Sequence, residues 1–142
     1  MALRPSGSAL WQPLFDGLRR LKSNWPARGW SWDSRLICIT SSFHNDHAAK
    51  ARTAALDALG TEWTASTLPN APPRVREFVE RTGGLRSGQF ILATAPVGGL
   101  IAFGLWWPWN DNDTISFRVG FIDVDPNEEP YPTLRDAFGV ML

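Results

Sequence analysis

The sequence predicts an α+β fold: a single domain in which helices pack on one face of a sheet. Two observations lead to this class. Helical patterns dominate the first 83 residues, whereas strand patterns dominate the stretch that follows. In residues 90–124, three apolar segments are separated by two turns, which predicts a three-strand antiparallel meander at the C-terminal end of the sheet.

The last strand of the meander has the clearest periodicity. Apolar and polar residues alternate from Thr114 to Phe121, as in a strand with one buried face. Leu100 to Trp107 is apolar throughout, which is typical of a central strand covered on both sides. The turn between these strands contains Pro108 and four Asn or Asp residues, and the turn before Leu100 contains Pro96 and a glycine pair.

A membrane-spanning helix is the alternative for this region, because the twenty residues from Phe90 to Trp109 carry no charge. Pro96 and the nearby glycines interrupt that segment, and its β-branched and aromatic residues favour strands. The alternating strand that follows also needs a pairing partner. We therefore expect a hairpin and no membrane association.

Three helices are expected before the meander, and a short fourth helix after it, within residues 131–142. The first begins near Pro13, the second follows a cap at Asn45 or Asp46 and ends at Gly60, and the third runs from Pro73 to a glycine pair. Their apolar faces are predicted to contain Leu14, Leu18 and Leu21; Ala48, Ala51, Ala55, Leu56 and Leu59; and Val75, Phe78 and Val79.

One or two further strands are expected between these helices. Leu36 to Thr40 is a short apolar strand, and Glu62 to Leu68 is a weaker candidate. Residues 24–34, which contain proline, glycine and three tryptophans, are predicted to form a loop.

Composition narrows the function classes. The 142 residues suit one globular domain, 1–142, with residues 1–8 as a flexible arm. Fourteen basic and fourteen acidic residues cancel, whereas nucleic-acid binders usually carry a basic excess. Cys38 is the only cysteine and the N-terminus lacks the apolar run of a secretory signal, so we expect a cytoplasmic protein.

Both histidines lie in the segment His44-Asn45-Asp46-His47. Together, His44, Asp46 and His47 could hold a divalent metal or perform acid–base chemistry. The segment lacks the spacing of a metalloprotease motif, and it lies where a strand meets a helix. A helix-capping role is therefore the preferred interpretation, and we expect neither a bound metal nor another cofactor.

Two further segments suggest contact with a protein partner. Trp106 and Trp107 must point to opposite faces of their strand, and Trp109 in the turn is the best candidate for exposure. The acidic segment at the end of the last strand does not follow a calcium-binding loop and could dock a basic partner. The predicted partner-binding residues are Trp107, Trp109, Asp111, Asp113, Asp123, Asp125, Glu128 and Glu129.

No catalytic set is evident in the sequence. There is no nucleophile-elbow motif, Cys38 lies in an apolar strand, and the glycine-rich segment 82–88 follows a helix instead of preceding one. Our first hypothesis is a small soluble binding protein that acts by protein–protein contact, as an inhibitor, immunity-type protein or accessory subunit. The alternative is a small enzyme or ligand-binding domain that uses His44, Asp46 and His47.

Overall fold

The predicted meander forms the centre of a six-stranded sheet. The computed structural model describes residues 7–140, in which strands β4 (Phe90–Ala93), β5 (Ala102–Pro108) and β6 (Thr114–Phe121) pair antiparallel in chain order. The uncharged segment 90–109 is therefore a hairpin. None of the described helices is long and apolar enough to cross a bilayer.

Three more strands extend this sheet to the order β1-β2-β6-β5-β4-β3, with every pair antiparallel. β2 (Cys38–His44) pairs with β6, β1 (Ser31–Asp33) pairs with β2, and β3 (Thr61–Thr64) pairs with β4. The α+β class is thus confirmed. Three strands lie outside the meander, whereas one or two were expected.

The additional strand is β1, which lies in the segment predicted to be a loop. The carboxylate of Asp33 accepts the backbone N–H groups of Arg35 and Leu36, at 3.0 and 3.3 Å, and so forms the turn from β1 into β2. This turn continues to Ile37, which has a positive φ of 52°. The strand expected over Leu36 to Thr40 consequently begins later, at Cys38.

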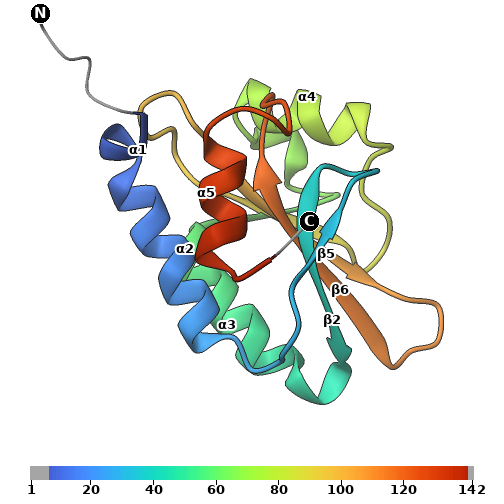
Figure 1. The fold of residues 1–142 in the computed structure, drawn as a ribbon. Helices are drawn as coiled ribbons and strands as arrows, with labels where there is room; N and C mark the ends of the chain where they lie inside the picture. Colours follow the sequence, from blue (N-terminus) through green and yellow to red (C-terminus); the bar gives the residue numbers. More distant parts are fainter. Residues whose placement is uncertain (1–6, 141–142) are drawn as a thin grey trace, which may run out of the picture.

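Three helices pack on one face of the sheet: α2 (Gln12–Asn24), α3 (Ala48–Leu59) and α5 (Pro130–Ala137) (Figure 1). Helix α4 (Pro73–Arg81) differs, because its buried Val75 and Val79 belong to a second core on the opposite face. The remaining helical segments are short: α1 (Gly7–Leu10), η1 (Asn45–His47) and η2 (Leu68–Asn70).

The larger core lies under α2, α3 and α5 and is rich in aromatic side chains. Trp25 stacks on Phe117 with their ring centroids 5.1 Å apart, and its Nε1–H donates to the hydroxyl of Ser41 at 2.9 Å. Ser41 is fully buried, so this bond satisfies a polar group that has no access to water. The smaller core joins α4 to the other face of β4 and β5, at Ile91 and Phe103.

The helix boundaries largely follow the sequence. Gly60, with a φ of 82°, ends α3 as expected, but α3 begins at Ala48 after the turn of η1. Leu56 is 39% exposed, and Ala54 is buried in its place. Most of the predicted N-terminal arm, residues 1–6, lies outside the described residues, as does the end of the expected C-terminal helix, residues 141–142. Residues 7 and 8 are part of α1.

Candidate functional site

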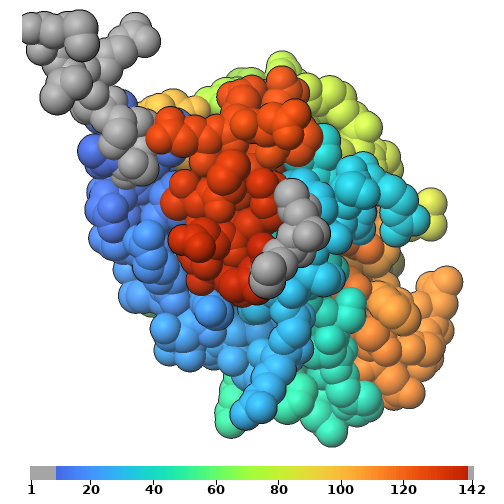
Figure 2. Space-filling view, in the orientation of Figure 1, coloured from blue at the N-terminus to red at the C-terminus, as the bar shows by residue number. Residues whose placement is uncertain are grey.

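The face of the sheet that carries α4 is only partly covered by that helix. Figure 1 shows α4 near one end of the strands, whereas the β5–β6 hairpin extends away from it at the other end. In Figure 2 the hairpin, in orange, forms a projection on the surface. Every second side chain of β2, β6 and β5 points to this face, and the strand register places these side chains next to one another. We call its uncovered part the open sheet surface: it consists of Ser42, His44, Arg118, Trp107 and Trp109, which are at least partly exposed, around the buried Ser116.

The three neighbouring tryptophans of the hairpin have different environments. Trp106 is 6% exposed and packs in the larger core against Phe90 and Phe117. Trp107 points to the opposite face, and Trp109 is 48% exposed in the turn. The expected division between Trp106 and Trp107 and the expected exposure of Trp109 are therefore confirmed. Their role in binding stays a prediction.

Trp107 and Trp109 are each held by a residue of β6. The Nε1–H of Trp109 donates to Ser116 Oγ at 2.8 Å, and Ser116 Oγ also lies 2.8 Å from Ser42 Oγ on β2. The guanidinium carbon of Arg118 lies 5.1 Å from the ring centroid of Trp107. These contacts join four structural segments (β2, β5, β6 and the hairpin turn) into one surface.

The hairpin turn is stabilised by one carboxylate. Asp111 accepts the backbone N–H groups of Asp113 and Thr114 at 2.9 and 2.8 Å, and the hydroxyl of Thr114 at 2.7 Å. These hydrogen bonds, the largest contribution coming from Asp113, hold the pKa of Asp111 below its usual value. Asp111 was predicted to bind a partner, yet its carboxylate is already used to form the turn.

We expect Asp111→Ala to lower the melting temperature at pH 7. A carboxylate whose pKa is depressed on folding stabilises the native state above its unfolded pKa, and this contribution is lost as pH falls through the folded pKa. The difference in melting temperature between Asp111→Ala and wild type, measured by calorimetry, should therefore be smaller at pH 3 than at pH 7. Asp111→Asn keeps an acceptor oxygen, so its melting temperature at pH 7 should lie between those of Asp111→Ala and wild type. An equal difference at both pH values would contradict this role.

The turn is also attached to the start of η1. Asn45 donates its backbone N–H to Asp113 O at 2.7 Å and its side-chain amide to Asn112 O at 2.8 Å. The two segments that sequence analysis treated separately, 44–47 and 106–113, therefore meet in space. Asn112 has a φ of 62°, a conformation that asparagine tolerates better than most residues.

The predicted histidine site is only partly assembled. His44 Nδ1 accepts the backbone N–H of Asp46 at 3.1 Å, and the Nε2 atom of His44 lies 3.8 Å from an oxygen of Asp113. Across residues 7–140, however, no group of three His, Cys, Asp or Glu side chains is arranged to hold a metal ion. The segment does form the turn before α3, but the expected cap at Asn45 or Asp46 is wrong: His44 caps η1 with its side chain, and the N-cap residue of α3 is His47, which makes no side-chain cap bond.

The acidic segment lies at the other end of β6 from the tryptophans (Figure 1). The eight extended residues of β6 separate the carboxylates of the hairpin turn, Asp111 and Asp113, from those of the acidic segment by about 24 Å. Asp123 forms an ion pair with Arg81 of α4, and Glu128 accepts the backbone N–H of Asp125 at 3.2 Å. The eight predicted partner-binding residues therefore form two separate groups, and Glu129 belongs to the second, at the start of α5.

A hollow of about 410 Å³ opens beside this acidic segment. Phe78, Phe103 and Tyr131 are among its apolar lining residues, and Asp123 and Asp125 are among the polar ones. The ion pair between Arg81 and Asp123 neutralises one of its two carboxylates. We therefore base the functional argument on the open sheet surface.

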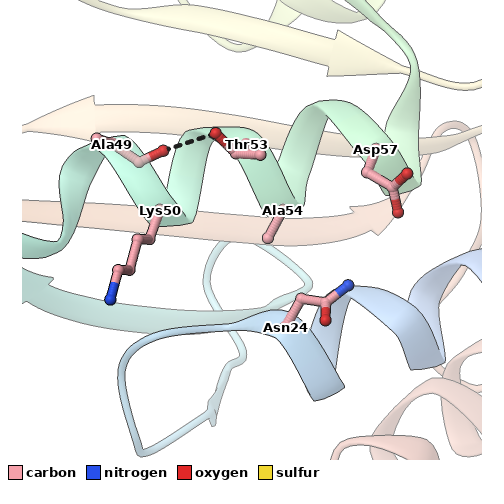
Figure 3. Close-up of a pocket in the computed structure, with 6 residues that line it drawn as sticks. All are labelled: Asn24, Ala49, Lys50, Thr53, Ala54 and Asp57. Carbon is pink, nitrogen blue, oxygen red and sulfur yellow. Dashed lines mark hydrogen bonds between the residues drawn. The ribbon is translucent and has the colours of Figure 1, made fainter.

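A second hollow, of about 530 Å³, lies between the end of α2 and α3 (Figure 3). Lys50 and Asp57 lie at opposite ends of it, with Ala54 facing Asn24 between them. Two of its polar side chains have partners within the helices: Thr53 donates to Ala49 O at 3.0 Å, and Asp57 lies 3.4 Å from Arg20. These features are those of an ordinary interhelical groove.

Cys38 has the environment of a core residue. It is 1% exposed, and burial raises the pKa of its thiol to about 11. The reactive thiolate is therefore disfavoured at neutral pH. The glycine-rich segment forms a helix end and a turn, with positive φ values at Gly83, Gly84 and Gly88.

Comparison of the chain with protein-family models, with curated proteins and with solved structures gives no match.

Proposed function

We propose that this is a small binding protein that acts by protein–protein contact, and that the open sheet surface is its contact surface. The observation that carries the proposal is the exposure of Trp109 beside Trp107 and Arg118 on an uncovered sheet face. Tryptophan and arginine are the residue types most enriched where interface energy is concentrated. An acidic margin at the hairpin, with Asp113 and Asp46 both largely exposed, supplies the polar rim that such surfaces usually have.

The rigidity of this surface supports the proposal. Trp109 is fixed by its hydrogen bond to Ser116, and the turn that carries it is fixed by Asp111 and Asn45. A side chain that is already ordered loses little conformational entropy when a partner binds, so more of the contact energy appears as affinity. The surface is a sheet face instead of a deep cleft, which suits a macromolecular partner better than a small substrate.

A masking role follows from this arrangement. A protein that covers part of its partner needs shape and charge complementarity but no catalytic group. An inhibitor, an immunity-type protein or an accessory subunit would each use the surface in this way. The distant carboxylates of Asp123, Asp125, Glu128 and Glu129 stay a separate prediction of a basic contact.

Affinity capture from the cells of origin tests the proposal. Wild type is compared with Trp109→Ala and with Leu56→Ala, a matched control that removes an apolar side chain 39% exposed on α3. We expect a protein retained in stoichiometric amount by wild type and Leu56→Ala, and at least tenfold weaker binding to Trp109→Ala. Calorimetry establishes that each variant is folded.

Two results would overturn the proposal. One is the retention of no stoichiometric protein by wild type. The other is equal affinity of the retained protein for wild type and Trp109→Ala, with cross-links that place the contact away from the hairpin.

A further inference from the structure

Arg118 lies within the open sheet surface without an acidic partner. Its neighbours in the strand register are Thr40 on β2 and Leu105 on β5, neither of which carries a charge. The Nε–H is buried and has no hydrogen-bond acceptor, and the guanidinium makes no hydrogen bond or ion pair with any residue from 7 to 140. By contrast, Arg52 and Arg81 are each paired with a carboxylate.

Because the Nε–H is buried, an anion brought by a partner can reach only the two terminal nitrogens of the guanidinium, which are not buried. The ring of Trp107 lies 5.1 Å from the guanidinium carbon, which restricts how that planar group can turn. A guanidinium matches a carboxylate with two parallel N–H···O bonds, the geometry that a lysine cannot reproduce. The indole N–H of Trp107 also makes no hydrogen bond with the described residues, so a second donor is available beside it.

We propose, on the basis of the function proposed above, that the partner places an aspartate or glutamate carboxylate on Arg118. The same partner segment places an apolar side chain against Trp109. Trp109 is bonded to Ser116, which is two residues from Arg118 on the same face of β6, so the two contact points are about 7 Å apart. That distance equals the spacing of residues i and i+2 in an extended chain. An extended partner segment fits this spacing when its acidic and apolar residues are separated by one position.

The surrounding charges favour a single carboxylate over a polyanion. Arg118 is the only arginine or lysine of the open sheet surface, and exposed Asp46 and Asp113 lie beside His44 at its margin. A nucleic acid would bring several phosphates close to these two carboxylates, whereas one carboxylate at Arg118 would stand apart from them.

Selection from a displayed library of random 12-residue peptides tests this inference. Peptides are selected on wild type, and those that also bind Trp109→Ala are removed. We expect the remaining peptides to share an Asp or Glu two positions from an apolar residue. Titration calorimetry with one such synthetic peptide should show at least tenfold weaker binding to Arg118→Gln, and a partial loss with Arg118→Lys.

Two controls connect the loss to the carboxylate. Arg28→Gln makes the same change of charge at an exposed position in the loop after α2, and it should bind the peptide as wild type does. Replacing the peptide's glutamate by glutamine should weaken binding to wild type but cause no further loss with Arg118→Gln, because the pair is already broken. Melting temperatures establish that the variants are folded.

The outcomes separate this inference from the proposed function. Peptides that require Trp109, but share no acidic residue and bind Arg118→Gln normally, would overturn the carboxylate contact and leave the protein-binding function standing. Failure to select any Trp109-dependent peptide would overturn the inference, whereas the proposed function is overturned by the capture experiment described above. Binding of a mixed-sequence 12-nucleotide single strand that is lost in Arg118→Gln would assign the surface to nucleic acid and overturn the inference.

Discussion

Replacing Gly104 by alanine is expected to reduce the free energy of unfolding by about 2–3 kcal/mol. A methyl group built on Gly104 would lie 2.7 Å from Leu59 Cδ1 and 2.9 Å from Phe117 Cε1. Both neighbours are fully buried, so neither can move without disturbing the larger core. Urea denaturation followed by tryptophan fluorescence measures the change.

A double-mutant cycle identifies the cause. Phe117→Leu alone should be destabilising, because it removes part of a buried ring that packs against Trp25 and Trp106. In the Phe117→Leu background, however, the additional cost of Gly104→Ala should be smaller, since the smaller side chain leaves room for the methyl group. Equal costs in the two backgrounds would show that the clash with Phe117 is not the reason.

Tyr131→Phe is expected to lower the free energy of unfolding at pH 7 by about 1–3 kcal/mol. The buried hydroxyl of Tyr131 accepts the backbone N–H of Phe121 at 2.9 Å and donates to the carbonyl of Ile37 at 2.9 Å. It therefore joins α5 to the end of β6 and to the turn before β2. Removing it leaves a backbone donor and a backbone acceptor without their partner.

The pH dependence of this difference provides the test. Burial raises the pKa of Tyr131 to about 12, from an ordinary value of 10. The unfolded chain therefore ionises first as pH rises, and wild type loses stability between pH 10 and 12, at roughly 1.4 kcal/mol per pH unit. Tyr131→Phe lacks this loss, so the gap between the two proteins should narrow above pH 10. Both proteins keep Cys38. A constant gap would contradict the prediction.

The sequence was most informative where one physical signal dominated. The alternation from Thr114 to Phe121 identified β6, because strand side chains point alternately to two faces and one face was apolar. β1 could not be identified in this way, since three residues are too few to show a period. Its formation depends on the turn at Asp33 and on pairing with β2, neither of which is visible in the local pattern.

In the candidate site, too, some features could be predicted from the local sequence and others could not. Exposure of Trp109 followed from its place in a turn, and the opposite orientations of Trp106 and Trp107 followed from strand geometry. Arg118 was missed because it was treated as one polar residue of the alternation. A charged residue in the middle of a largely buried strand was the available signal. The separation of the carboxylates into two groups depends on the length and direction of β6, which local composition does not report.

The pairing of β2 with β6 has a consequence for the order in which the chain folds. Ser42 and Ser116, bonded across this pair, are 74 residues apart. During synthesis, β2 therefore emerges from the ribosome long before the strand it needs, and only the short β1 can pair with it in the meantime. Closing so large a loop is slow. Ile39 and Phe43 remain without their final packing until β6 arrives, which makes the first half of the nascent chain the part most dependent on protection from aggregation.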